Sequence, residues 1–175
     1  MILPETHQIE SPLGPLLLAA TPQGLCGVWF TDQRHLPSPQ LRASWPSNPN
    51  HPLLREAAAQ LTAYFSGRLV PFDLPLDLSA GTAFQQSVWQ ALRRIPTGQT
   101  LSYGAMAHFL NKPSASRAVG AAVGRNPLSI VVPCHRVLGA AGQMTGYAGG
   151  VWRKQALLTL EGHPMPLRSS ISRDL

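Results

Sequence analysis

The sequence predicts an α/β first half, a small antiparallel sheet with one helix, followed by a mainly helical second half that contains a helix-turn-helix. Short apolar runs separated by Gly- and Pro-rich turns fill residues 7–30, which is typical of short strands. Apolar residues then recur at helical spacing over residues 53–65. In the second half, two short helical segments flank Asn111-Lys112-Pro113, which is the layout of a helix-turn-helix.

The first half is expected to hold three strands, a loop, one helix and an extended segment. The strands fall at residues 7–10, 16–20 and 24–30, and the Pro-, Ser- and Asn-rich loop covers residues 31–52. Gly67 ends the helix, and the best linker is Ser79-Ala80-Gly81. We therefore predict a supporting domain over residues 1–78, a second domain over 79–165 and a disordered tail over 166–175.

The second half is expected to begin with a capped helix. Thr82 and Gln85 form a capping box, so the helix should cover about residues 83–95. Two shorter helices and a final one are expected over residues 103–110, 115–124 and 152–160, with Ser102 and Ser114 as caps of the first two.

The segment of residues 118–124 consists of small side chains only. Each glycine inside a helix costs about 1 kcal/mol relative to alanine, so a close approach to another surface should offset that cost. One interpretation is tight packing between two helices. The other is a thin helix that enters a nucleic-acid groove, with Arg117 near its start.

The stretch of residues 130–137 combines a strand signal with a cysteine that has basic neighbours. Three β-branched residues predict a short buried strand over residues 130–132, which Pro133 ends. Cys134 follows, with His135 and Arg136 behind it, and positive charge lowers the pKa of a thiol and favours the nucleophilic thiolate. The alternative is an inert cysteine at a strand end, although burial of a histidine and an arginine beside it would be costly.

Charge is distributed unevenly between the two halves. Residues 1–81 hold four Arg and six acidic residues, a net charge of −2, whereas residues 82–175 hold ten Lys or Arg and two acidic residues, a net charge of +8. The basic half also contains the Cys-His motif, which indicates a polyanionic partner; a solvated basic surface is the alternative.

Composition argues against several classes of protein. No apolar run is long enough to cross a bilayer, and the longest early one, residues 16–20, fits a strand better than a signal peptide. Cys26 and Cys134 cannot make a disulfide framework, and the six histidines have no ligand spacing. We expect a reduced thiol in the cytoplasm, no metal and no cofactor.

Several motifs occur in order and at characteristic separations: Arg117-Ala118-Val119-Gly120, Asn126-Pro127, Pro133-Cys134-His135-Arg136-Val137 and Gly146-Tyr147-x-Gly149-Gly150. With them, residues 82–162 resemble the methylated-DNA–protein-cysteine methyltransferases, also called 6-O-methylguanine-DNA methyltransferases. Ser11-Pro12-Leu13-Gly14 and Ala63-Tyr64-Phe65 with Gly67 extend the resemblance into the first half. It implies a ribonuclease-H-like first domain and a winged-helix-like second domain.

The resemblance also implies an activity, DNA repair by direct reversal of damage. The partner would be double-stranded DNA that carries alkylated bases, and the damaged base would be flipped out of the duplex. The alkyl group of 6-O-alkylguanine would move irreversibly to the protein's own cysteine, with 4-O-alkylthymine left open as a second substrate. A thioether has no easy route back to a thiolate, so each chain would react once. We expect a monomer, with cooperative assembly on DNA left open.

The roles implied for the catalytic residues follow the same motifs. Cys134 would accept the alkyl group, His135 would act as a water-mediated general base, and Glu161 would orient the imidazole. Asn126 would fix the turn at the site, and Tyr103 would crowd the phosphate and donate a hydrogen bond to the flipped guanine. From the residues alone, a solvated acid at a helix end, a plain Asn-Pro turn and a core tyrosine remain alternatives for Glu161, Asn126 and Tyr103.

The resemblance also marks DNA-contacting and cavity residues. Arg117 would fill the gap left by the flipped base, with a phosphate contact as the alternative. The other residues expected at the DNA are Ser102, Ala118, Gly120, Ala121, Arg125 and Arg136. Those expected to wall the cavity are Val137, Tyr147, Ala148, Gly149 and Lys154. Some members have serine where this chain has Ala148. The alanine lacks the hydroxyl group, so this chain has one side-chain donor fewer for the leaving oxygen. Some bind zinc in the first half, where this chain offers only Cys26 as a cysteine.

Two other functions compete with alkyl transfer. A protein that only binds alkylated DNA would lack the acceptor cysteine, so the presence of Cys134 argues against it. A Cys-His hydrolase or peroxidatic thiol enzyme would explain the motif, but neither the helix-turn-helix nor the uneven charge.

Overall fold

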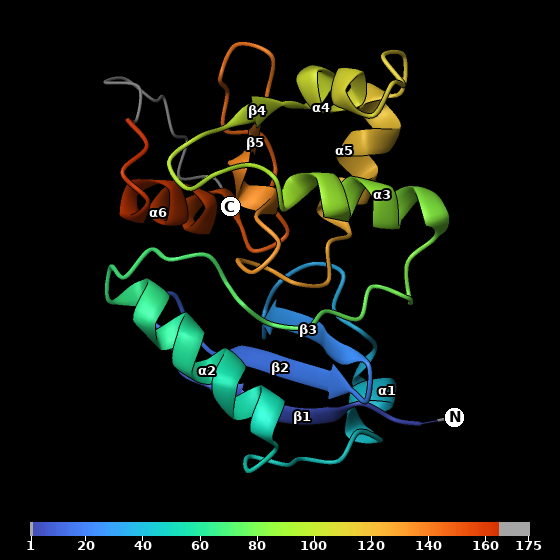
Figure 1. Cartoon of the computed structure of the whole chain (residues 1–175), viewed down its shortest axis with the longest axis vertical. Coiled ribbons are helices and arrows are strands. Elements are labelled where there is room, and N and C mark those ends of the chain that lie inside the picture. The colour runs from blue at the N-terminus through green and yellow to red at the C-terminus, as the bar shows by residue number, and fades with distance from the viewer. Residues whose placement is uncertain (1, 165–175) are drawn as a thin grey trace.

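A three-stranded antiparallel sheet forms the base of the molecule, with strand order β1-β2-β3 (Figure 1). The computed structural model describes residues 2–164. The strands are β1 (Glu5–Ile9), β2 (Leu16–Thr21) and β3 (Gly24–Phe30). β2 is the central strand, and its apolar residues are largely buried, because the sheet is covered on both sides. The antiparallel sheet predicted for the first half is confirmed.

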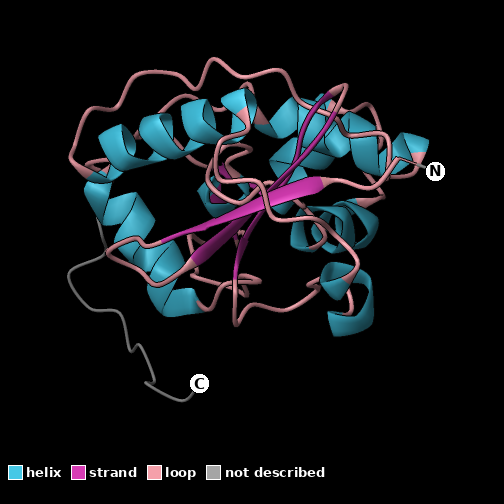
Figure 2. Ribbon diagram, turned by 90° about the horizontal axis from the view of Figure 1, so that it is seen from below, coloured by secondary structure: helices cyan, strands magenta, loops and turns pink. Residues whose placement is uncertain are grey.

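Helix α2 (Pro52–Phe65) lies across the sheet and buries one face against it. Its buried residues recur every three or four positions: Leu54, Ala57, Leu61 and Tyr64. Seen from below, the strands lie across the middle of the molecule with helices around them (Figure 2). The residues predicted as an uninterrupted loop before α2 contain a five-residue helix, α1 (Pro39–Ala43), which is too short to show a periodic pattern.

The second half is built from α3 (Ala83–Leu92), α4 (Tyr103–Phe109), α5 (Ser116–Gly124) and α6 (Val151–Leu160). Helix α5 packs against α3 and α4, and the indole of Trp89 donates a 2.8 Å hydrogen bond to the carbonyl of Ala122. This arrangement confirms the predicted helix-turn-helix, in which α5 is the second helix.

The helix caps match the sequence in two of three cases. The capping box of Thr82 and Gln85 is present, and Ser102 Oγ accepts a 3.0 Å hydrogen bond from the Ala105 N–H. The prediction for Ser114 is wrong, because α5 begins at Ser116, one residue later than predicted, and its N-cap, Ala115, makes no side-chain capping bond.

The predicted strand over residues 130–132 is also wrong. Those residues form successive turns, in which the N–H of Val132 bonds the carbonyl of Leu128 at 2.9 Å. Ile130 has φ +73°, a left-handed conformation that is rare for a β-branched residue. The contact with the sheet lies earlier, where Leu128 bridges Val28 of β3. The apolar run is therefore buried in consecutive turns. A short apolar run without periodicity is equally compatible with buried turns and with a buried strand, so the sequence cannot distinguish the two.

Two short parallel strands, β4 (Leu101–Ser102) and β5 (Val137–Leu138), connect the start of α4 with the segment after Cys134. The residues between the turns and β5 form a single 3₁₀ turn, η1 (Cys134–Arg136). Strands of two residues leave no pattern in the sequence, which therefore does not predict them. They hold the cysteine turn close to α4.

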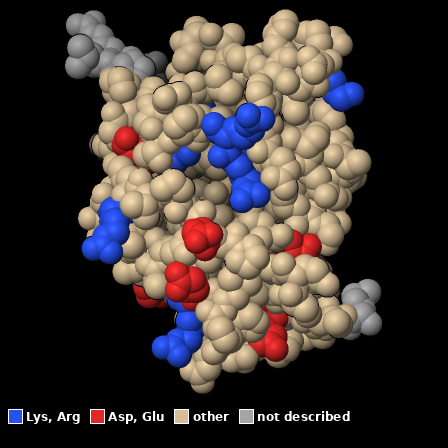
Figure 3. Space-filling view, viewed as in Figure 1, with Lys and Arg blue, Asp and Glu red and all other residues tan. Residues whose placement is uncertain are grey.

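The charge segregation predicted from the sequence is visible on the surface. On the face in Figure 3, a cluster of basic side chains lies near the C-terminal end of α3, and most acidic side chains lie over the first half. Among residues 2–164, no helix has the length and apolar composition needed to span a bilayer. The predicted tail, residues 166–175, lies outside the described residues.

Candidate active site

Cys134 lies at the start of η1 and lines a cavity of about 300 Å³. Only 6 % of the residue is exposed, yet it contributes to the cavity wall and is not sealed in the interior. The walls come from both halves of the chain, and the lining residues besides Cys134 are Arg34, His35, Tyr103, Gly120, Val123, Gly124, Thr145, Gly146, Tyr147 and Ala148.

The thiol of Cys134 is in an environment with opposing effects on its pKa. Burial raises the pKa of the thiol, and this is the largest effect. The amide of Asn126 and the ammonium group of Lys154 act in the opposite direction without cancelling it. The expectation that basic neighbours lower the pKa below its usual range is therefore wrong. The resting sulfur is a protonated thiol, and a base must take its proton before it can act as a nucleophile.

Asn126 fixes the turns that lead to Cys134. Its Nδ2 donates to the carbonyl of Val132 at 2.8 Å, and its Oδ1 accepts from the Leu128 N–H at 3.0 Å. The residue is buried, so each of these bonds satisfies a polar group that has no access to water. The contacts are those of a residue that shapes the site, which is more than a plain Asn-Pro turn requires.

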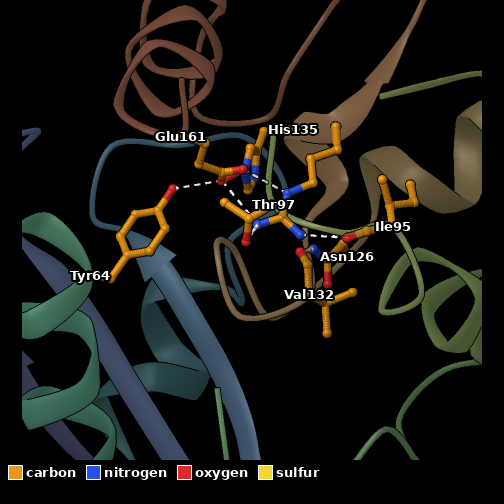
Figure 4. Close-up of polar contacts among 8 residues, drawn as sticks. Tyr64, Ile95, Thr97, Asn126, Val132, His135 and Glu161 are labelled. Atoms are coloured by element: carbon orange, nitrogen blue, oxygen red, sulfur yellow. Dashed lines mark hydrogen bonds and ion pairs between the residues drawn. The ribbon is translucent and has the colours of Figure 1, made fainter. Parts of the chain in front are cut away.

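His135, the residue after Cys134 in η1, forms a buried pair with Glu161 (Figure 4). Nε2 of His135 lies 2.8 Å from Oε2 and 3.1 Å from Oε1 of Glu161, and both side chains are fully buried. The carboxylate accepts, so Nε2 carries the proton and Nδ1 presents a lone pair. Within residues 2–164, Nδ1 has no hydrogen-bond partner. Sequence reasoning brought these two residues together correctly.

The protonation states of this pair follow from their surroundings. Burial lowers the pKa of His135 and outweighs the neighbouring carboxylate, so the imidazole is neutral. Burial would raise the pKa of Glu161, but hydrogen bonds from His135 and Arg136 lower it to about 2. The result is a neutral base held by an ionised carboxylate. A solvated acid at the end of α6 is excluded as an interpretation of Glu161.

Arg136 does not lie on a DNA-contacting surface, and that prediction is wrong. Its Nε donates to Glu161 Oε1 at 2.6 Å, its Nη1 to the carbonyl of Ile95 at 2.6 Å, and its Nη2 to Thr97 Oγ1 at 3.2 Å. The guanidinium is buried because a buried carboxylate requires a counterion.

Tyr64 is a residue of this network that sequence reasoning missed as a site residue. Its hydroxyl donates a 3.0 Å hydrogen bond to Glu161 Oε2 across 97 residues of sequence (Figure 4). The residue belongs to α2, so the first half reaches into the site and does more than support it. Its only signal in the sequence was its place in the motif Ala63-Tyr64-Phe65.

The loop after β5 forms the wall opposite α5. Tyr147 and Ala148 line the cavity as predicted. A Cβ on Gly149 would lie 2.9 Å from the Tyr147 ring and 3.1 Å from Phe30, so this position requires glycine. Gly149 thus shapes the cavity through its packing and does not itself line it.

Lys154 and Val137 lie behind this wall. Lys154 is fully buried, and its Nζ donates to the carbonyl of Thr145 at 3.0 Å. Burial lowers the pKa of the amine to about 8, while the neighbouring Cys134 acts in the opposite direction. Val137 pairs with Leu101 in the core and does not line the cavity, so its prediction as a cavity residue is wrong.

The exposed face of α5 carries the residues expected at the DNA. Arg117, Ala118, Ala121 and Arg125 are exposed within one arc of the helix surface, whereas Val119, Ala122 and Val123 are buried on the opposite side. Packing between helices therefore accounts for the buried side of α5, and the exposed side is the one on which the nucleic-acid interpretation depends. Gly120 lies between them and faces the ring of Tyr103 across the cavity.

Ser102 serves as the cap of α4, and Tyr103 lines the cavity, so neither is a core residue. Arg34 and His35 were not predicted at the site, because residues 31–52 carry no motif. Within residues 2–164, no group of three or more His, Cys, Asp or Glu is arranged to hold a metal ion.

Comparisons with known proteins agree with this geometry. Residues 83–163 match the family model of the 6-O-methylguanine DNA methyltransferase DNA-binding domain, and residues 6–78 match that of its ribonuclease-like domain. The methylated-DNA–protein-cysteine methyltransferase of Mycobacterium leprae is 50 % identical over 90 % of this chain and 92 % of its own length. The protein of the same name from Methanosarcina acetivorans is 50 % identical over 87 % of this chain and 95 % of its own length.

A solved structure has the same fold. The crystal structure of Mycobacterium tuberculosis OGT in complex with DNA aligns with a TM-score of 0.82 and 48 % identity, covering 90 % of this chain and 92 % of that one.

Proposed function

Since this chain belongs to the 6-O-methylguanine DNA methyltransferase family, we propose that Cys134 is the sulfur that takes the alkyl group. The protein is a methylated-DNA–protein-cysteine methyltransferase, which moves the alkyl group from 6-O-alkylguanine to its own cysteine, once per chain. Cys134 fits this role because it lines the cavity. Cys26 lies on β3 outside the cavity, and burial raises its pKa to about 12.

His135 is the base that removes the thiol proton. Its Nε2–H is held by Glu161, so Nδ1 is the available acceptor and takes the proton of Cys134 through a water molecule. The imidazole then becomes a cation. The negative charge of Glu161 stabilises that cation, which explains why an ionised carboxylate is kept in the interior.

The transfer is a displacement at a saturated carbon. The S–C bond forms as the bond between the alkyl carbon and the guanine oxygen breaks, and the electron pair of the broken bond stays on guanine. Hydrogen-bond donors around that oxygen lower the barrier. We assign this role to the hydroxyl of Tyr103 and the backbone N–H groups near Ala148, both at the cavity wall, and to the charge of Lys154 behind that wall.

DNA is the partner, and α5 is the element that holds it. The reactive oxygen of guanine lies inside the duplex, so the base must rotate out before it can enter the cavity. The exposed small residues of α5 allow a close approach to the groove, and Arg117, in its first turn, fills the space that the base vacates. The alkylated duplex is bound by one chain at a time, and the reaction takes place in the cytoplasm, where thiols are kept reduced.

One observation carries the proposal: Cys134 lines the cavity beside α5, and the next residue in the same turn, His135, is paired with Glu161. The test is intact-mass measurement after incubation with a duplex that contains 6-O-methylguanine, followed by peptide mapping. We expect one added methyl group, on Cys134. Cys26→Ser should react fully, and Cys134→Ser should bind the duplex without gaining mass.

The competing functions give different results in the same experiment. A protein that only recognises the lesion would shift the mobility of the duplex and gain no mass. A thiol hydrolase would do neither. Methyl transfer by Cys134→Ser would contradict the assignment of the acceptor.

A further inference from the structure

The turn of residues 31–35, which follows β3, is hydrogen-bonded at several points to the loop of residues 145–149 and to α6. The N–H of Arg34 donates to the carbonyl of Ala148 at 2.9 Å. Arg153 donates to Asp32 at 2.7 Å and to the carbonyl of Gly149 at 3.1 Å. The turn is therefore a fixed part of the cavity wall, although it belongs to the first half of the chain.

Gln33 anchors the same turn from the inside. The side chain is buried, and its Oε1 accepts hydrogen bonds from the N–H of Phe30 at 2.8 Å and from Ser129 Oγ at 3.3 Å. Its Nε2 donates to the carbonyl of Arg34 at 3.2 Å. These bonds hold His35 at φ +61°, a left-handed conformation that is uncommon for residues other than glycine.

The consequence is that two basic side chains of the first half project at the cavity. Arg34 and His35 are both exposed, and both line the cavity together with residues of α4 and α5. Arg125, at the C-terminal end of α5, lies close by, since burial and then the charges of Arg125 and Arg34 lower the pKa of His35. Two basic side chains of the first half thus lie at the cavity, and the charge of Arg125 acts on one of them.

No described acid compensates this cluster. The nearest carboxylate in sequence, Asp32, is paired with Arg153, and no acidic group contributes to the pKa of His35. Elsewhere the first half carries an excess of acidic residues. Positive charges held together at a cavity mouth repel one another unless an anion binds between them.

We propose that Arg34 contacts a backbone phosphate of DNA at the cavity mouth, with Arg125 beside it, so that the first half of the chain takes part directly in DNA binding. The phosphate belongs to the strand whose damaged base occupies the cavity. This inference rests on the proposed function of the cavity. It assigns DNA contact to a turn outside the helix-turn-helix.

The first test measures affinity for an undamaged duplex by fluorescence anisotropy over a series of salt concentrations. The logarithm of the binding constant falls linearly with the logarithm of salt concentration, and each phosphate contact contributes about 0.9 to the slope. We expect Arg34→Ala to reduce the slope by about that amount, and Arg34→Lys to retain it. Arg55→Ala, which removes an exposed arginine of α2, is the matched control and should leave the slope unchanged. A slope unchanged in Arg34→Ala would overturn the proposal.

The second test separates DNA contact from damage to the cavity. Transfer rates are measured with the alkylated duplex and with free 6-O-benzylguanine, which has no phosphate. Arg34→Ala should slow transfer from the duplex by a larger factor than transfer from the free base. Equal losses would mean that Arg34 only shapes the cavity, and would overturn the proposal. Failure of the wild-type protein to transfer would instead contradict the proposed function, while the salt slope would still decide the DNA contact.

Discussion

Glu161 and Arg136 form a buried ion pair in which Oε1 and Nε are 2.6 Å apart, and the same carboxylate holds His135. Every partner of this carboxylate in the described structure is a donor: the imidazole, the guanidinium and the hydroxyl of Tyr64. The carboxylate therefore links the stability of the protein to the protonation state of its base.

Replacement of Glu161 by glutamine should destabilise the protein. The change leaves the Arg136 guanidinium buried without a counterion, which typically costs about 3–5 kcal/mol. Urea denaturation of Glu161→Gln measures this loss, and alkyl transfer should slow as well because the imidazolium loses its stabilising charge. Asp73→Asn, at an exposed position, is the control and should unfold like the wild type. A loss no larger in Glu161→Gln than in the control would show that the pair is not required.

The stability of the folded chain should fall at acid pH in two stages. The folded pKa of His135 lies below its ordinary value of 6.5, so the neutral form stabilises the fold above that pH and the contribution is lost as pH falls below it. The folded pKa of Glu161 is lowered from 4.5 to about 2, so its contribution is lost between those values. Urea denaturation at a series of pH values measures both stages. Glu161→Gln should lack the second, and an unchanged acid limb in that variant would contradict the assignment.

Removal of the Tyr64 hydroxyl should raise the pKa of the base without disturbing DNA binding. Tyr64→Phe deletes one hydrogen bond to a buried charge, worth about 1.5–3 kcal/mol, and keeps the ring that packs against Phe65 and Phe72. With one donor fewer, the carboxylate of Glu161 holds the proton of the imidazolium more strongly. The pKa of His135 therefore rises, and the pH profile of transfer should shift upward with it. Tyr64→Leu removes the ring as well and should lose more stability. A pH profile identical to that of the wild type would limit Tyr64 to a packing role.

Apart from the Ser114 cap, the helix and cap predictions were correct, because their signal is local. The apolar spacing of α2 and the capping box of α3 depend on residues three or four positions apart, and both are present. The Cys134 motif and the pairing of His135 with Glu161 were also found, the latter from the family resemblance, with support from the presence of only two acids in the basic half.

The errors concern contacts that sequence separation hides. Arg136 was assigned to DNA because nothing near it in the sequence shows that its partners are Glu161 and the carbonyl of Ile95, 41 residues away. Tyr64 and Arg34 were missed for the same reason, since each reaches the site from the first half. The turns at residues 130–132 were taken for a strand because burial alone favours apolar residues in either conformation.

Replacement of Arg117 by alanine should weaken binding and slow repair of duplex DNA. A flipped base leaves a gap in the stack of a duplex, and a side chain that fills this gap stabilises the flipped state there. The loss of transfer rate in Arg117→Ala should therefore be larger on a duplex than on a single strand. Stopped-flow transfer rates on both substrates test this. Arg93→Ala changes an exposed arginine at the end of α3 and serves as the control. Duplex kinetics equal to those of the wild type would exclude Arg117 from this role.

The hydrogen bond from Tyr64 to Glu161 has a consequence for how the chain can be divided. It spans both halves, and so does the bond from Arg34 to Ala148. Cutting the polypeptide between residues 66 and 82 would leave one fragment with a buried carboxylate short of a donor and the other with a tyrosine hydroxyl short of an acceptor. The environment of the Glu161 carboxylate is therefore completed by both halves of the chain, and the first half supplies one of its donors.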